Sequence, residues 1–280
     1  MPPADSFAQN LKSNPKIDSI PSFSQKGRDP VVKSYIMTDI GRKRSSNQDA
    51  FCHARLASGV QFMVLCDGMG GHRGGNVASE IAVRSFSELL TDRLTEVLRP
   101  KELKSLLSGM IARVSFLISQ TAAETPELAG MGSTVVLAVR CGKKICIAHV
   151  GDSRAYLYRD GTLRRLTKDH SLVQEMVDRN EISPEEAESH PHRNVITRTL
   201  GYAEDSQPEI LFSDVRDGDV FLLCTDGLTV PLRDQRILEL LRENPPEAVT
   251  PLLISEALQG GGPDNITVGI LYEERKEDQR

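Results

Sequence analysis

The chain has 280 residues, of which 26% are charged and 39% hydrophobic, and its formal net charge at pH 7 is -5. This length is enough for one large domain or two small ones with a buried core. The interspersed charges and the 5% aromatic content give no support to nucleic-acid binding.

The cellular compartment of the protein is inferred from features that the sequence does not contain. We find no uninterrupted apolar segment near the roughly 18 residues that span a bilayer and no secretory signal at the start of the chain. The five cysteines form no CxxC pair, and Cys66 and Cys224 lie in apolar runs. We therefore expect a cytoplasmic protein without membrane association, with cysteines that are small buried side chains and neither zinc ligands nor disulfides.

Residues 1–34 differ from the rest of the chain. Prolines stand among Ser, Asn and Lys without a hydrophobic period, which is typical of a flexible polar tail. Residues 274–280 are interpreted as a charged C-terminal tail, and residues 35–273 as the folded domain.

From residue 35 onward, blocks of strands alternate with pairs of helices. The strands are predicted at 35–39, 50–53, 60–66, 134–139, 145–150, 155–159, 162–166, 220–224 and 266–271. The helices are predicted at 76–98, 101–124, 234–243 and 246–258. Pro251 should bend or split the last helix. Strand blocks separated by helix pairs indicate an α+β fold with segregated layers.

The segment 169–201, which we call the flap, follows the central strands. It is polar and is expected to be mobile. SPEEAESH, beginning at Ser183, predicts a short capped helix within it. His170, His190 and His192 also lie there, but their spacing fits no zinc pattern.

Four short motifs each place an aspartate beside a turn-forming Gly or Asn. They are SSNQDAF around Asp49, VLCDGMGG around Asp67, LLCTDGL around Asp226 and GGPDNITV around Asp264. Three of these aspartates lie at the end of an apolar run or just before one, where a carboxylate is expected only if several ends converge on a positive charge. Converging hard oxygen ligands are what Mg²⁺ or Mn²⁺ requires, so the motifs predict a divalent metal site.

An Asp-Gly pair taken alone is more often a hairpin turn. Asp160-Gly161 lies between the alternating runs YLYR and TLRRL and is interpreted as such a turn, with Asp217-Gly218 as a second candidate. The four motif aspartates differ from these because they recur together with Arg44 in one fixed order.

This set of motifs resembles the metal-dependent Ser/Thr protein phosphatases, the PPM or type 2C family, in the form common in bacteria. The resemblance covers about residues 35–272, through DIGRKRSSNQD, DGMGG, GSTVV, AHVGDSRAYLYRDG, LTKDHS, SHPHRNVITRTLG, TDGL and GPDNITV. It implies two packed antiparallel β-sheets flanked by helices on both outer faces, an αββα sandwich, in which residues 35–273 are the catalytic domain.

The resemblance also implies a set of metal ligands. Asp67 would bridge two Mn²⁺ or Mg²⁺ ions, and the carbonyl of Gly68 would bind one of them. Asp226 and Asp264 would bind the other ion, and Asp49 would act through water ligands. The alternative for Asp67, a cap on the following helix, fits poorly because GMGGHRGG intervenes.

Two further residues have alternatives of their own. Arg44 occupies the family's phosphate-binding position, and its planar fork can hold two phosphate oxygens at once; Arg42 and Lys43 are interpreted as a solvated basic turn. Asp152, in HVGDSRAY, matches a residue that in bacterial relatives helps to bind a third, weaker ion together with the Asp226 position. The alternative is that Asp152 fixes the turn and pairs with Arg154.

The chain departs from the family pattern at three positions. Gln48 replaces a common Glu, which removes one negative charge near the metals, and Asn47 is expected to tie down the loop instead. Val230 stands where many members carry an acidic residue, which weakens the expected third site. Met69 replaces a His that animal relatives place after the metal-bound Asp-Gly, and His72 is nearby. The sequence therefore does not assign the residue that donates a proton to the leaving group.

The resemblance implies a monomeric enzyme that hydrolyses phosphoserine and phosphothreonine by attack of a water held between two metal ions. Its partners would be phosphorylated proteins, including a Ser/Thr kinase whose signalling it reverses. An alternative is a catalytically weak member that binds phosphoproteins, which Gln48 and Val230 favour and the aspartate set opposes. A third idea, a structural metal-binding domain, leaves Arg44 unexplained.

Overall fold

The structure is a computed structural model that describes residues 32–202 and 206–274, apart from the side chain of His72. Most of the predicted N-terminal tail and nearly all of the predicted C-terminal tail lie outside the described residues. The first strand, β1, begins at Val32 and not at residue 35, because its register with the last strand continues to the pair Val32↔Glu273. Residues 32–34 therefore belong to the sheet.

Eleven strands are present in the described part of the chain. They are β1 (Val32–Asp39), β2 (Asp49–Arg55), β3 (Gln61–Met69), β4 (Gly132–Ser133), β5 (Val135–Cys141), β6 (Lys144–Val150), β7 (Arg154–Arg159), β8 (Thr162–Arg165), β9 (Glu209–Asp214), β10 (Val220–Cys224) and β11 (Ile266–Glu273). They form two antiparallel sheets with the orders β1-β11-β10-β7-β8 and β2-β3-β5-β6-β9, and β4 pairs with β3.

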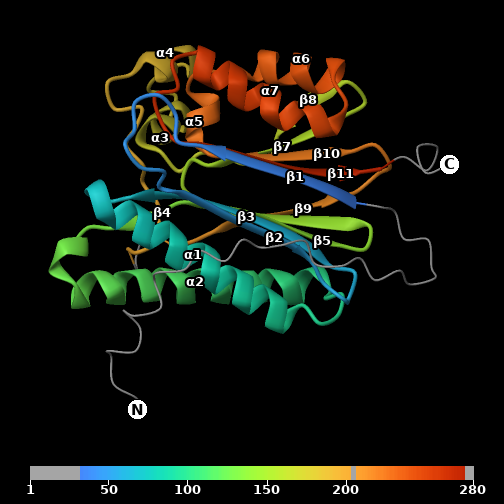
Figure 1. The fold of residues 1–280 in the computed structure, drawn as a ribbon, viewed down its shortest axis with the longest axis horizontal. Helices are drawn as coiled ribbons and strands as arrows, with labels where there is room; N and C mark the ends of the chain where they lie inside the picture. The colour runs from blue at the N-terminus through green and yellow to red at the C-terminus, as the bar shows by residue number, and fades with distance from the viewer. Residues whose placement is uncertain (1–31, 203–205, 275–280) are drawn as a thin grey trace.

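The helices are α1 (Gly71–Arg93), α2 (Pro100–Glu124), α3 (Leu172–Asp178), α4 (Pro184–Ser189), α5 (Asp226–Thr229), α6 (Asp234–Glu243) and α7 (Pro246–Gln259), with a 3₁₀ turn η2 (Pro126–Leu128). α1 and α2 cover the outer face of the sheet that contains β3, and α6 and α7 cover the outer face of the sheet that contains β10 (Figure 1). The predicted αββα sandwich is confirmed.

Three apolar layers hold the sandwich together. Alternate strand residues face the partner sheet, as Met63, Leu65, Phe221 and Leu223 do in the central layer. The residues between them face the helices: Val64, for example, packs in the layer under α1 and α2. This alternation follows from the period of two along a strand and explains why strands buried on both faces read as continuous apolar runs.

α2 is a long helix with many apolar residues. By length and composition it meets the criterion for a membrane span, with a mean hydropathy of 1.3 over its best window. Core helices meet the same criterion, and here Leu103, Leu107, Ile111 and Val114 are buried against α1 and the sheet.

Helix α1 begins at Gly71, five residues before the predicted start, and ends at Arg93, five residues before the predicted end. Glycines normally disfavour a helix, but here they allow close packing of the first turn against a strand. A Cβ on Gly75 would lie 2.6 Å from the carbonyl oxygen of Gly68. At the other end the hydroxyl of Ser58 donates to the carbonyl of Leu94 (2.7 Å), which fixes the point where the chain leaves the helix.

Pro251 does not split α7, which runs unbroken from Pro246 to Gln259. The residue is exposed, and the carbonyl that loses its partner is that of exposed Glu247, where water can replace the missing hydrogen bond. The predicted split is wrong for this reason.

Several short elements were not predicted. β9 pairs with β6 at the edge of its sheet, where the sequence analysis placed no strand. α3, α5 and β4 have seven, four and two residues and were not predicted either. The predicted turns are confirmed, because Asp160 and Gly161 have φ of 50° and 75° and Gly218 has φ of 89°.

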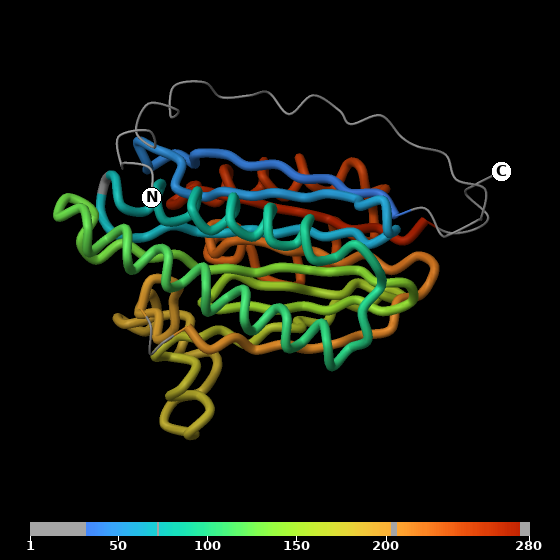
Figure 2. Tube along the Cα trace, turned by 90° about the horizontal axis from the view of Figure 1, so that it is seen from below, coloured from blue at the N-terminus to red at the C-terminus, as the bar shows by residue number. Residues whose placement is uncertain are grey.

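The flap contains α3 and α4, and the part around α4 projects from the body of the molecule (Figure 2). The predicted short helix is confirmed as α4. The hydroxyl of Ser183 accepts a hydrogen bond from the Glu186 amide (3.2 Å), and the Glu186 carboxylate accepts one from the Ser183 amide (2.7 Å). This capping box satisfies two of the free amides at the helix start.

Candidate metal centre

The sandwich brings the four aspartate motifs to one end of the two sheets. Asp49 and Asp67 face each other in the register of β2 and β3. Asp226 begins α5 directly after β10, and Asp264 lies just before β11. The predicted convergence is therefore what the structure shows.

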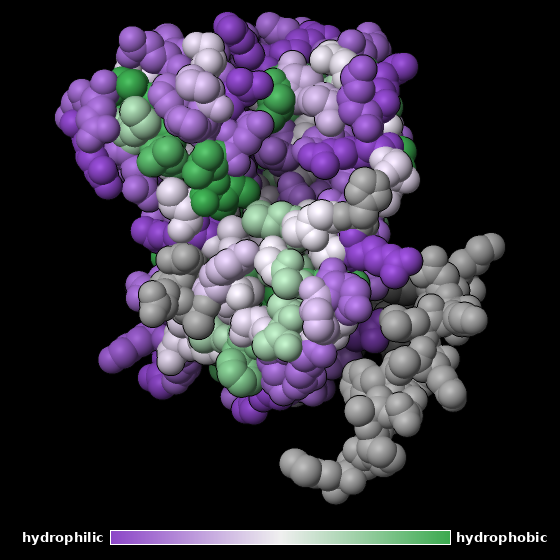
Figure 3. All heavy atoms as spheres, turned by 90° about the vertical axis from the view of Figure 1, so that its left-hand side faces the viewer, coloured by the Kyte–Doolittle hydropathy of each residue, from purple (hydrophilic) through white to green (hydrophobic). Residues whose placement is uncertain are grey.

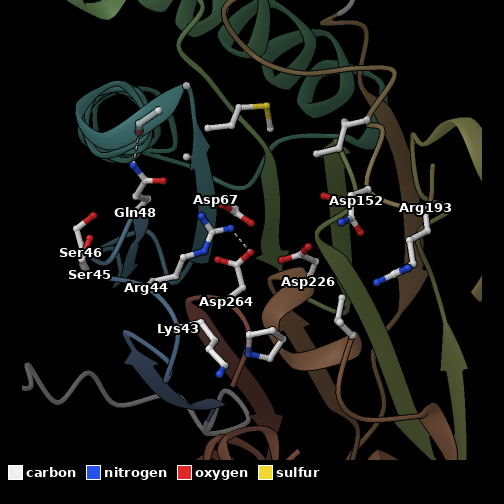
Figure 4. A pocket seen from close by; sticks show the side chains of 18 residues that line it. Lys43, Arg44, Ser45, Ser46, Gln48, Asp67, Asp152, Arg193, Asp226 and Asp264 are labelled. Atoms are coloured by element: carbon white, nitrogen blue, oxygen red, sulfur yellow. Dashed lines mark hydrogen bonds and ion pairs between the residues drawn. The ribbon is translucent and has the colours of Figure 1, made fainter. Parts of the chain in front are cut away.

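A cavity of about 750 Å³ opens at this end of the sandwich. Its lining includes Asp67, Gly68, Asp152, Asp226, Asp264 and Arg44, so six of the seven predicted site residues meet there (Figure 4). The seventh, Asp49, lies behind Asp67 and does not line the cavity.

Glycines make the close approaches that this convergence needs. A Cβ on Gly68 would lie 2.0 Å from the carbonyl oxygen of Gly75, and one on Gly227 would lie 1.9 Å from the carbonyl oxygen of Asn265. No side chain fits at these distances, so the Asp67-Gly68 and Asp226-Gly227 pairs are not simple hairpin turns. The glycines let α1 and β11 pack directly against the backbone that carries each aspartate.

The carboxylates repel one another in this setting. Burial and the charges of neighbouring carboxylates raise the pKa of Asp67 and Asp152 well above the ordinary range. Burial, followed by the charge of Asp264, raises the pKa of Asp226 to about 6. Carboxylates held together in this way are unfavourable unless they are protonated or balanced by a cation.

Unpartnered oxygens point to the same conclusion. The Oδ1 atoms of Asp49, Asp152 and Asp226 are buried and have no hydrogen-bond partner among the described residues. Buried polar atoms are rarely left in this state without a role. A set of acidic oxygens around one cavity fits hard divalent cations such as Mn²⁺ or Mg²⁺ and offers none of the soft ligands that select other metals.

Asp49 is held by threonines. Its Oδ2 accepts hydrogen bonds from the hydroxyls of Thr225 (2.9 Å) and Thr267 (2.6 Å). These bonds lower its pKa, but burial outweighs them and raises the pKa to about 7. Oδ1 of Asp49 is left without a hydrogen-bond partner among the described residues, and Asp49 does not line the cavity.

Arg44 reaches into the acidic cluster. Its Nη2 donates to Oδ2 of Asp264 at 2.6 Å, and this bond raises the pKa of the guanidinium. In Figure 4 the guanidinium lies beside Asp67 and Asp264. Arg44 is therefore the cation that balances part of the acidic charge in this structure.

Asp152 does not pair with Arg154. The guanidinium of Arg154 instead binds Asp169, at the start of the flap, with a shortest contact of 2.7 Å. Asp152 lines the cavity and forms no salt bridge among the described residues, so the pairing with Arg154 considered from the sequence is wrong. Its own backbone amide donates a hydrogen bond to its carboxylate, which is what a role in fixing the turn requires.

The loop before β2 is tied down by two amide side chains. Asn47 accepts from the Asp49 amide (3.1 Å) and donates to the Thr38 hydroxyl (2.8 Å), so its predicted role in holding the loop is confirmed. The side-chain Nε2 of Gln48 donates to the Gly71 carbonyl (2.8 Å). Gln48 therefore joins this loop to the start of α1 where a Glu would have added charge.

The flap contributes residues that the sequence did not single out. Arg193, Asn194 and Ile196 line the cavity, and Figure 4 shows Arg193 on the side opposite Arg44. They lie within SHPHRNVITRTLG, which carried the family resemblance, but nothing in that pattern showed which side chains face the site.

A second group of metal-type ligands, His149, His170 and Glu209, lies at the base of the flap. The Gly151 amide donates to Nδ1 of His170 (3.1 Å), so the ring proton of neutral His170 is on Nε2, which faces Glu209 at 3.4 Å. A protonated nitrogen does not bind a metal, and the Arg198 guanidinium lies 3.3 Å from the same atom. We interpret this group as a hydrogen-bonded anchor for the flap.

The sequence and fold now place the chain among known proteins. Residues 40–251 match the protein phosphatase 2C family, and the chain belongs to that family. It is 39% identical over 238 residues to the serine/threonine protein phosphatase PstP of Mycobacterium tuberculosis, covering 85% of this chain and 44% of the relative. It is 35% identical over 237 residues to the protein phosphatase PhpP of Streptococcus pneumoniae, covering 84% of this chain and 95% of the relative.

Solved structures agree with this placement. The Streptococcus agalactiae serine/threonine phosphatase superposes with a TM-score of 0.81 at 35% identity, covering 87% of this chain and 100% of that one. The catalytic domain of PstP, solved with two manganese ions, superposes with a TM-score of 0.76 at 35% identity, covering 87% and 99%. This chain spans less than half of the length of full PstP.

Proposed function

We propose that this chain is a metal-dependent protein phosphatase that removes phosphate from phosphoserine and phosphothreonine. One observation carries the proposal: Asp67, Asp152 and Asp226, whose pKa values are raised, line one open cavity together with Asp264 and Arg44. Membership of the protein phosphatase 2C family and the two manganese ions in the PstP catalytic domain support it.

One set of residues would bind the metal ions, and a second set would bind the phosphate of the substrate. Asp67, the Gly68 carbonyl, Asp226 and Asp264 would hold two divalent ions, and Asp152 would offer a weaker third position beside Asp226. Divalent ions at such a site lower the pKa of bound water and neutralise phosphoryl oxygens. Asp49 would orient the ligand set from behind Asp67, because its threonine bonds fix its carboxylate plane.

Arg44 would bind the phosphate of the substrate. A guanidinium can donate two parallel hydrogen bonds to phosphate oxygens, and among the described residues Arg44 donates a side-chain hydrogen bond through Nη2 alone. Arg44 pairs with Asp264 in this structure, and if Asp264 were engaged in holding a cation, the guanidinium of Arg44 would be available for an anionic group. Arg193, across the cavity, supplies a second positive side chain on the substrate side.

The test is release of phosphate from a phosphothreonine peptide in the presence of Mn²⁺, followed by addition of excess chelator. We expect turnover with Mn²⁺ and its loss with chelator, restored by renewed Mn²⁺. Turnover that is insensitive to the chelator would contradict the metal assignment. Binding of the peptide without release of phosphate would favour the alternative function, a phosphoprotein-binding module.

The cellular setting forms part of the proposal. Relatives named as Ser/Thr protein phosphatases lead us to propose phosphorylated proteins as substrates, including a Ser/Thr kinase, and a monomeric cytoplasmic enzyme that opposes kinase signalling. Co-purification with the chain trapped by Asp67→Asn would identify the substrates.

A further inference from the structure

The mouth of the cavity has an apolar wall that the phosphatase chemistry does not use. Val230 and Ile196 line the cavity, and Val195 precedes Ile196 in the flap. Val230 is 53% exposed and Val195 is 43% exposed, which is unusual for large apolar side chains. Figure 3 shows apolar side chains gathered on this face among hydrophilic ones.

The wall is built on fixed backbone from two parts of the chain. The Val230 amide donates to the Asp226 carbonyl (2.8 Å) at the end of α5. On the flap side, the Leu172 amide donates to the Val195 carbonyl (2.9 Å), and Ile196 forms a β-bridge with Ser171. An ion pair between Arg233 and Glu188 (3.4 Å) also joins the segment after Val230 to α4 of the flap.

The wall lies where the residues on either side of the phosphorylated residue of a substrate would be placed. Val230 lies four residues after Asp226, so a phosphate held by the carboxylate end of the cavity is close to the wall. Consecutive Cα atoms are only about 3.8 Å apart, so the residue next to the phosphorylated one must lie within the same mouth. Single exposed apolar residues need no explanation, but several around one binding cavity indicate contact with a partner.

We propose that Val230 and Ile196 form a subsite for an apolar side chain directly next to the phosphoserine or phosphothreonine of the substrate. The proposal rests on the proposed phosphatase function and names its substrate class: phosphoproteins with an aliphatic residue beside the phosphorylated one. Val230 is the informative position, because an acidic residue there would place a charge at the mouth and would disfavour an apolar neighbour.

The experiment uses two phosphothreonine peptides that differ only at the two residues flanking the phosphothreonine, which are Val in one and Ser in the other. With Mn²⁺ we expect kcat/KM to be about tenfold higher for the Val peptide, at the low end of the range for apolar pockets. The ratio should fall to about threefold in Val230→Ser and in Ile196→Ser, and to about one in the double variant.

The matched control is Val97→Ser. Val97 is 54% exposed and lies beside a separate groove at the other end of the helix layer. Its substitution should leave the ratio unchanged. The melting temperatures of Val97→Ser and Val230→Ser should agree with that of the wild type because both side chains are exposed, whereas Ile196 is half-buried and its variant is compared per folded molecule. A ratio near one in the wild-type protein, or a ratio unchanged in the double variant, would overturn the proposal.

A third peptide with Asp on both sides tests the opposing idea, that the basic side chains Lys43 and Arg193 at the mouth select acidic substrates. Faster hydrolysis of the Asp peptide than of the Val peptide overturns the apolar subsite. A chain that hydrolyses neither the peptides nor an aryl phosphate refutes the proposed function instead. In that case the affinities of the same peptides, from fluorescence anisotropy, still decide whether the wall prefers Val over Ser.

Discussion

The two ends of the sandwich treat buried carboxylates in opposite ways. At the end away from the cavity, Glu273 is 3% exposed and accepts two hydrogen bonds from Arg140 (2.9 and 3.2 Å). Asp219 is 1% exposed and is held by Arg159 at 2.6 and 2.7 Å. At the cavity end, three aspartates keep an oxygen without a hydrogen-bond partner in the described part of the chain.

The difference separates structural charge from functional charge. Both ends place acids at strand ends, so position in the sheet does not distinguish them. Burial raises the pKa of Glu273 too, so a raised pKa does not distinguish the two ends. A buried acid with a dedicated arginine has its hydrogen bonds within the fold, whereas a group of acids with unpartnered oxygens is balanced only when cations bind. The same isosteric change should therefore have opposite effects on stability at the two ends.

The largest effect is expected for Asp67→Asn. Loss of the central carboxylate should reduce phosphate release by more than about a thousandfold, because the site loses a ligand and not only one hydrogen-bond donor. In excess chelator the same variant should unfold at higher temperature than the wild type, because one repelling charge is gone. Steady-state kinetics with Mn²⁺ and thermal melting with chelator measure the two effects.

Asp160→Asn is the matched control for that variant. Asp160 is an acid of an Asp-Gly turn with φ of 50°, a conformation that Asn also adopts, and it lies outside the cavity. Activity and melting temperature should both stay close to the wild type. Equal loss of activity in the two variants would show that the assay does not report on the site.

At the opposite end, Glu273→Gln should lower the free energy of unfolding by roughly 3 kcal/mol, because it leaves Arg140 buried without its carboxylate. Urea unfolding measures the loss, and phosphate release per folded molecule should not change. Replacement of both partners, Arg140→Met with Glu273→Leu, should recover most of the lost stability. A double variant as unstable as Glu273→Gln would contradict a simple pairing role.

Sequence patterns predicted the layers and the aspartate cluster for physical reasons. Strands buried on both faces produce long apolar runs, as in 60–66 and 220–224, and aspartates beside turn-forming residues at the ends of such runs indicated the cluster. Both signals are local. The resemblance to the phosphatase family then supplied the order in which the local pieces converge.

Features that depend on contacts between distant segments could not be predicted in this way. β9 is an edge strand that is defined by its pairing with β6, and α1 starts early only because Gly75 packs on Gly68. Arg193 resembles any exposed flap residue until the fold turns it towards the cavity. Asp49 was expected near the metals, but its two threonine partners come from β10's end and β11, 176 and 218 residues away along the chain.

Arg44→Lys tests the guanidinium that pairs with Asp264 at the cavity end of the sandwich. Lysine keeps the charge but loses the planar fork, so we expect a loss of roughly 1.5 to 3 kcal/mol in binding of a phosphopeptide, the range for hydrogen bonds to charged groups. The change should raise KM more than it lowers kcat, unless the fork tightens in the transition state. Unchanged kcat and KM would remove Arg44 from phosphate binding.

The smallest effect concerns pH in the metal-free protein. Burial raises the folded-state pKa of Asp49 to about 7 from an ordinary value near 4. Between these values the folded state binds more protons than the unfolded state, so this carboxyl stabilises the fold at low pH and loses that contribution as pH rises. The buried rings of His149 and His170 have lowered pKa values, to about 4 for His170, so their contribution to stability is lost as pH falls.

The measurement must therefore be a difference: the free energy of unfolding of the wild type minus that of Asp49→Asn, from urea unfolding in chelator at pH 5, 6 and 7. We expect this difference to fall by roughly 1 to 2 kcal/mol from pH 5 to pH 7. With saturating Mn²⁺ the fall should disappear, because bound cations favour the ionised acids over the same range. A difference that rises with pH in chelator would mean that Asp49 is ionised and satisfied in the folded state, like the acids at the opposite end of the sandwich.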